Sequence, residues 1–150
     1  MEIYQGENFW SVRTAYKPGM PLNQEKRHII EGKLGVTLPD EYIELMNKQN
    51  GGELQYRYIV FEDGEAIIIP FFFEMDVDSG VGMSPIIVDQ YGLPDELVLL
   101  TGDLEAWVAL DYRNRKIPKV VYFIQEETGM WQEFEIAASF SEFLKKLIRK

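Results

Sequence analysis

The chain has 150 residues, the size of one domain with one sizeable core. It has no cysteine, which excludes disulfides, thiolate nucleophiles and iron–sulfur clusters, and its net charge of −10 disfavours nucleic acids and anionic membranes as partners. No signal peptide and no apolar run long enough to span a bilayer is present, so we expect a cytoplasmic protein. Residues 1–150 are predicted to form a single domain, with 1–20 as an arm packed on it.

Two helices are predicted near the N-terminus. The first covers residues 24–34, because Asn23 can cap its start and Gly35 is a typical residue just past a helix end. The second starts at Pro39, which suits a first helical position. It ends at Asn50-Gly51-Gly52, whose glycines favour a turn.

The middle of the chain is typical of antiparallel strands. Residues 54–61 and 66–74 are rich in β-branched and aromatic side chains, and the Asp-Gly between them predicts a hairpin turn over 62–65. Residues 75–96 are expected to be loop-like, with a short helix from Ser84 to Gly92. Further strands are predicted over residues 97–100, 106–112, 119–125 and 131–136.

The last predicted element is an amphipathic C-terminal helix. Ser139 and Glu142 have the spacing of a capping box. Apolar residues then recur at helical spacing, at Phe140, Phe143, Leu144, Leu147 and Ile148. The fold class is therefore α+β: an N-terminal helix pair, a central antiparallel, meander-like sheet of about five to six strands, and this helix.

No pattern in the sequence indicates catalysis or a cofactor. The one histidine, His28, lies inside a predicted helix, and no nucleophile motif or phosphate-binding loop accompanies it. Asp76, Asp78 and Gly80 imitate the first half of a calcium loop, but Val81 and Ile87 stand where glycine and glutamate are needed. We therefore expect no catalytic residue, no cofactor and no metal.

The negative charge is concentrated in the middle of the chain. Between Arg57 and Arg113 there are twelve acidic residues and no Lys or Arg, whereas the rest has thirteen acidic and fifteen basic residues. This block is either a set of solvated loops that keep the protein soluble or an acidic face for a basic partner. If it is a face, the expected contact residues are the acids of the turns and loops: Glu62, Asp63, Glu65, Glu74, Asp76, Asp78, Asp103 and Glu105.

Three blocks of the sequence resemble the SUKH superfamily, the Smi/Knr-type domains. The first runs from Glu31 through Leu34-Gly35, Leu38-Pro39 and Tyr42 to Asn50-Gly51-Gly52. The second contains Gly92-Leu93-Pro94, Gly102-Asp103 and the strand from Trp107 to Arg113, and the third contains Pro118 to Tyr122 and Ser139 to Leu144. Together they cover about residues 22–148. Most of these residues are interpreted as determinants of the fold rather than as contacts.

The resemblance implies a non-enzymatic α+β domain that binds proteins. Bacterial members of the family resemble immunity proteins that neutralise toxin domains, often nucleases. Other members resemble adaptors or regulators that bind several proteins. Both functions stay open here, with an enzyme as a distant third. Exposed strand edges would also allow two copies to pair as a homodimer.

Overall fold

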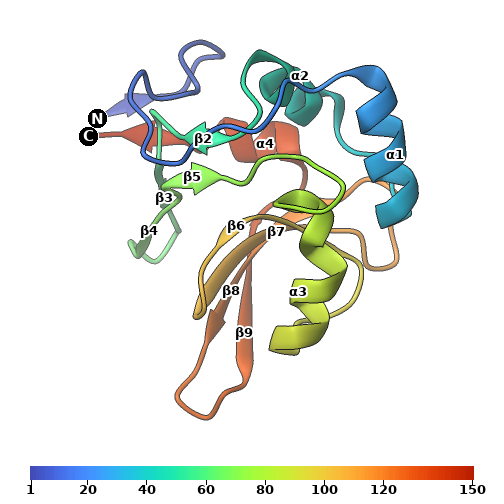
Figure 1. The fold of residues 1–150 in the computed structure, drawn as a ribbon. Coiled ribbons are helices and arrows are strands. Elements are labelled where there is room, and N and C mark those ends of the chain that lie inside the picture. The colour runs from blue at the N-terminus through green and yellow to red at the C-terminus, as the bar shows by residue number, and fades with distance from the viewer.

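The computed structural model describes the whole chain, residues 1–150, as an α+β fold with three antiparallel sheets (Figure 1). The helices are α1 (Gln24–Leu34), α2 (Asp40–Lys48), α3 (Ser84–Tyr91) and α4 (Phe140–Leu144), with a 3₁₀ turn, η1 (Val81–Met83), before α3. The strands are β1 (Glu2–Ile3), β2 (Gly52–Glu53), β3 (Tyr58–Val60), β4 (Ala66–Ile68), β5 (Phe71–Phe72), β6 (Leu97–Gly102), β7 (Ala106–Asp111), β8 (Lys119–Gln125), β9 (Trp131–Ala137) and β10 (Ile148–Arg149). The predicted fold class is confirmed.

The first two helices form where local signals predict them. The Asn23 side chain accepts a hydrogen bond from the Lys26 amide at 2.8 Å, which caps the start of α1. Gly35 ends α1 in the left-handed conformation, with φ 72°, where a β-carbon would be strained. Pro39 precedes α2 as its N-cap instead of being its first residue, because its ψ of 137° is extended.

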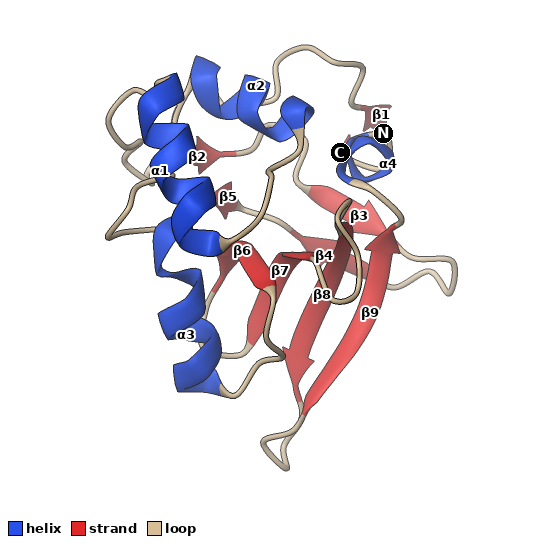
Figure 2. Cartoon of the chain, turned by 90° about the vertical axis from the view of Figure 1, so that its right-hand side faces the viewer, coloured by secondary structure: helices blue, strands red, loops and turns tan.

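Strands β6 to β9 form a four-stranded meander in which each strand pairs with the next one in the chain. One face of the meander packs against α3 through a small apolar cluster that includes Val88, Leu99 and Trp107. The opposite face carries Val108 and Leu110 into the main core. Figure 2 shows α1 and α3 along one side of the molecule and the long β8–β9 hairpin along the other.

The segment between α2 and η1 forms shorter strands than predicted. Of the runs 54–61 and 66–74, only β3, β4 and β5 form ladders, although the turn at 62–65 is confirmed by the pairing of β3 with β4. The break between β4 and β5 falls at Pro70, which has no N–H to donate to a neighbouring strand. β5 therefore pairs with β2 in a separate two-stranded sheet.

Both chain ends lie in one small sheet, with strand order β1-β10-β3-β4 (Figure 1). The predicted helix through Ile148 is wrong beyond Leu144, because α4 ends there and Ile148 pairs with Ile3 and Tyr58 as part of β10. The burial pattern alone did not distinguish the two outcomes, since Leu147 is buried either way. Ladder bonds to β1 and β3 replace the helical bonds that the C-terminal residues would otherwise make.

The cap of α4 gives a first prediction. The Ser139 hydroxyl oxygen accepts a hydrogen bond from the Glu142 amide at 3.1 Å. Ser139→Ala is expected to lower the free energy of unfolding by about 1 kcal/mol, because that amide loses its partner. Urea denaturation measures the change. Ser141→Ala, inside the same helix, is the control, and an equal loss in both variants would contradict the role of the cap.

Candidate functional site

Two turns with exposed carboxylates lie at one end of the meander, and a third lies beside its face. The β3–β4 turn lies beside the face of the meander opposite α3, where the Phe61 ring packs against Tyr122 and Phe134, with ring centroids 6.5 and 6.3 Å apart. The β6–β7 turn is held to β8 by a hydrogen bond from the Gln125 amide to the Glu105 carbonyl oxygen at 2.8 Å. The β8–β9 turn closes the hairpin at the lower end of Figure 1.

We call this end, together with the β3–β4 turn, the distal surface. No ion pair within the protein engages any of its turn carboxylates. Burial raises the pKa of Tyr122, and the negative charge of Asp103 raises it further. The exposed carboxylates of the distal surface are Glu62, Asp63, Glu65, Asp103, Glu105, Glu126 and Glu127.

Two of these carboxylates also shape their turns. The Asp63 side chain accepts a hydrogen bond from the Glu65 amide at 2.9 Å. The Asp103 side chain accepts from the amides of Glu105 and Ala106 at 2.9 and 3.1 Å. Each of them uses Oδ1 for these bonds, so the second oxygen and most of the charge remain available to solvent or to a partner.

Exposed apolar side chains lie among the acids of the distal surface. Leu104 lies between Asp103 and Glu105 and is 66% exposed, and Met130 at the end of the β8–β9 turn is 70% exposed. Phe134 is 45% exposed although its ring packs against Phe61 and Tyr122. Apolar side chains within a charged rim are the composition expected of a protein-binding surface.

The other three predicted contact residues lie elsewhere. Glu74, Asp76 and Asp78 belong to the segment between β5 and η1, beside α1. The Lys26 Nζ lies 3.7 Å from Oδ2 of Asp76, and the Lys33 Nζ lies 3.9 Å from Oδ1 of Asp78. These two carboxylates are therefore partly neutralised within the protein, and the structure does not group them with the acids of the distal surface.

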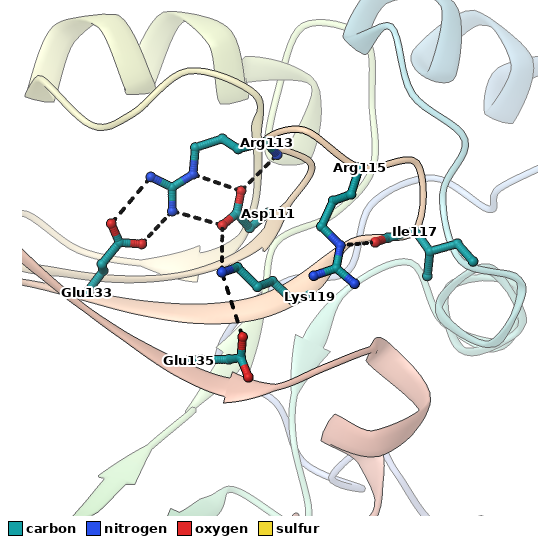
Figure 3. Close-up of polar contacts among 7 residues, drawn as sticks. All are labelled: Asp111, Arg113, Arg115, Ile117, Lys119, Glu133 and Glu135. Carbon is teal, nitrogen blue, oxygen red and sulfur yellow. Dashed lines mark hydrogen bonds and ion pairs between the residues drawn. The ribbon is translucent and has the colours of Figure 1, made fainter.

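A buried ion network lies on the α3 face of the meander (Figure 3). Asp111 is fully buried and accepts hydrogen bonds from the Arg113 guanidinium at 2.9 and 2.8 Å. Arg113 also binds Glu133, and Lys119 lies 3.9 Å from Asp111 and 3.7 Å from Glu135. Both cations come from the end of β7 and the start of β8, and both glutamates come from β9, so the network ties three strands together.

The environment of Asp111 shifts its pKa downward. Burial by itself would raise the pKa of this carboxyl, but the hydrogen bonds from Arg113 and the charges of Arg113 and Lys119 outweigh it. Hydrogen bonds to Asp111 and Glu133 in turn raise the pKa of Arg113. Because these charges neutralise one another within the protein, we interpret the network as structural.

A cleft of about 970 Å³ lies between α1, α3 and the β7–β8 loop. His28 lines this cleft, together with Glu31, Glu96, Arg115 and Lys116. Its charges are mixed, and the Arg115 guanidinium donates a hydrogen bond to the Ile117 carbonyl oxygen within the loop. Sequence reasoning treated His28 as an isolated surface residue. Residues of two family-like sequence blocks, one that includes α1 and one in β6–β7, line the cleft. The occurrence of both blocks in the sequence is the signal that could have pointed to it.

No group of three or more His, Cys, Asp or Glu side chains is arranged to hold a metal ion. None of the helices has the length and apolar content that crossing a membrane requires.

The fold is that of a small α+β domain. Comparison with family models identifies its family: the SMI1-KNR4 cell-wall model of the SUKH superfamily matches residues 24–144, so the chain belongs to this family and is a protein-interaction domain. The family is generally non-catalytic. A search of the curated proteins found no match.

Proposed function

We propose that this domain binds and neutralises a basic toxin domain in the cytoplasm, and that it does so through the distal surface. One observation carries the proposal: the exposed carboxylates of these three turns form no ion pair within the protein, and exposed apolar side chains lie next to them. Nucleases hold their anionic substrates in basic grooves, which makes a nuclease toxin a fitting partner.

The two kinds of side chain would have different tasks in such a complex. The carboxylates would attract a basic partner and speed the encounter, since complementary charge can raise association rates by one to three orders of magnitude. Leu104, Met130 and Phe134 would supply apolar contacts that lose water on binding, and such contacts carry most of the affinity of an interface.

Neutralising the turn acids tests the proposal. The partner is first recovered by affinity capture at low salt from the native cell and identified by mass spectrometry. Its association rate is then measured with the wild type and with the triple variant Glu62→Gln, Glu65→Gln, Glu105→Gln. We expect the rate constant for the variant to fall by about tenfold and to depend less on salt.

The matched control neutralises the three predicted acids outside the distal surface. Glu74→Gln, Asp76→Asn, Asp78→Asn removes the same formal charge, but Asp76 and Asp78 already face lysines of α1. This variant is expected to associate nearly as fast as the wild type. Equal losses in both triple variants would mean that only net charge matters, and the proposed surface would then be wrong.

The matched family is an SMI1-KNR4 cell-wall family, which favours a second candidate function. In that case the domain is an adaptor or regulator with several partners of modest affinity. Expressing the captured partner alone separates the two candidates. A partner that stops cell growth, and whose effect is reversed by co-expression of this chain, supports immunity, whereas a harmless partner supports the adaptor.

A further inference from the structure

Strand β9 is a free edge of the meander. The sheet order is β6-β7-β8-β9, so β9 has a neighbour on one side only. The other edge, β6, is partly covered, because the Phe73 amide donates a hydrogen bond to the Leu100 carbonyl oxygen at 2.8 Å. Figure 2 shows β9 as a long strand at the side of the molecule opposite α1 and α3. Residues 132–135 in the middle of this strand are exposed.

The turn before β9 determines which of its backbone groups are free. The Glu126 amide bonds to the Met130 carbonyl oxygen at 2.8 Å, and ladder bonds alternate along an antiparallel pair from that point. The register pairs Ile124 with Gln132 and Tyr122 with Phe134, which places these pairs in the bonded positions. The N–H and C=O groups of Glu133 and Glu135 therefore point away from β8.

Proteins commonly protect such an edge with charged side chains or by covering it. Here a covering contact lies at one end only, where the Lys146 ammonium donates a hydrogen bond to the Ile136 carbonyl oxygen at 2.7 Å, and the rest of the edge carries the charged side chains of Glu133 and Glu135. The stretch from residue 131 to 135 has no such cover. It is long enough to accept a short added strand, whose backbone would bond to the free groups of Glu133 and Glu135.

The side chains of this stretch specify what kind of strand fits. Glu133 and Glu135 lie on one face of the sheet, and Phe134 lies on the other face. The two glutamates pair with Arg113 and Lys119 of the buried network, but their side chains remain 46% and 54% exposed, so an added strand can still reach them. An added strand would place two residues beside the glutamates and one between them beside Phe134. Opposite charges and aromatic–apolar pairs are the favourable cross-strand neighbours, so the matching order is basic, apolar, basic.

We propose that β9 binds an extended segment of a partner protein by strand addition, and that this segment alternates basic and apolar residues. A second copy of the chain is the other occupant that an edge strand invites. Two antiparallel β9 strands would bring their glutamates together in a protein of net charge −10, and like charges opposite each other are unfavourable. The inference rests on the proposed function, because it names how a basic partner would be held next to the distal surface.

A synthetic peptide tests the proposal. The probe is Lys-Val-Lys-Val-Lys-Val-Lys, and the control peptide has the same composition with its four lysines grouped together. We expect the alternating peptide to bind about tenfold more tightly than the grouped one, a difference of about 1.4 kcal/mol. Amide hydrogen exchange by NMR is expected to slow at Glu133 and Glu135 but not at Gln132 and Phe134, which are already bonded. Equal binding of both peptides, or protection at other amides, would overturn the proposal.

A variant gives a second, independent measurement. Glu133→Pro removes an outward N–H that makes no bond within the protein, and it is expected to abolish the slow exchange at Glu135. Glu133→Gln is its control, because it removes the charge and keeps the N–H. If a captured partner depends on the turn acids but binds Glu133→Pro normally, strand addition is wrong and the proposed function stands. If the peptide protects β9 while the turn acids have no effect on the partner, the proposed function fails and strand addition stands.

Discussion

Asp111→Asn is expected to lower the free energy of unfolding by about 2–3 kcal/mol, near the lower end of what losing one partner of a buried ion pair costs. The asparagine amide would place an N–H donor where Asp111 now accepts hydrogen bonds from Arg113. The loss is moderated because Arg113 and Lys119 each keep a second carboxylate, Glu133 and Glu135, and are partly exposed. Urea denaturation at neutral pH measures the difference.

Asp89→Asn is the matched control, because Asp89 is exposed on α3 and forms no ion pair. Its stability is expected to match the wild type within about 0.5 kcal/mol. A loss of the same size in both variants would show that net charge, and not the network around Asp111, determines the effect.

The same residue predicts a pH dependence. The pKa of Asp111 is lower in the folded protein than its ordinary value of 3.8, so the unfolded chain binds this proton more readily. The stability that Asp111 contributes is therefore fully present above about pH 4 and is lost as the pH falls below that value. Stability curves of the wild type and Asp111→Asn should converge in acid, and curves that stay parallel would contradict this assignment.

Asn50→Ala is expected to cost about 2–4 kcal/mol, because Asn50 is 3% exposed and makes three hydrogen bonds to the backbone. Its amide nitrogen donates to the carbonyl oxygens of Met20 and Met75 at 2.7 and 3.0 Å, and its oxygen accepts from the Met75 amide at 2.8 Å. Alanine would leave three buried or partly buried backbone groups without partners. Asn47→Ala, exposed on α2, is the control and should leave stability unchanged or slightly raised.

The prediction for Asn50 also tests how the family motif works. Asn50 begins the Asn-Gly-Gly motif, and it ties the N-terminal arm to the segment after β5 instead of facing a partner. Gly102 in the second block has a similar structural reason, because a β-carbon there would lie 2.1 Å from the Trp107 ring. If Asn50→Ala left stability unchanged but weakened partner binding, the motif would be a contact site instead.

Local signals in the sequence account for most of the helices and turns. The caps of α1 and α4, the glycine after α3 and the 62–65 turn each depend on residues within a few positions of one another. Because such interactions depend only on neighbouring residues, the sequence predicts them well. Chain ends are different: the pairing of β10 with β1 joins residues almost the whole chain apart, and it shortened the predicted C-terminal helix.

Part of the distal surface was likewise predictable from the sequence, and part was not. Charge counting identified the acidic block, and turn signals placed Glu62, Asp63, Glu65, Asp103 and Glu105 in exposed turns. Neither the charge count nor the turn signals predicted that Glu126, Glu127 and Phe134 belong to the distal surface, or that lysines of α1 pair with Asp76 and Asp78. These contacts depend on how the strands and helices pack in the folded chain.

The sequence by itself determined the family, the α+β class and the excess of negative charge, because composition, periodicity and short motifs are local properties. Only the tertiary structure decided which carboxylates stand free, which are paired, and which strand is left as an edge. Charge and backbone pairing act through space, and the distances between their partners exist only once the chain has folded.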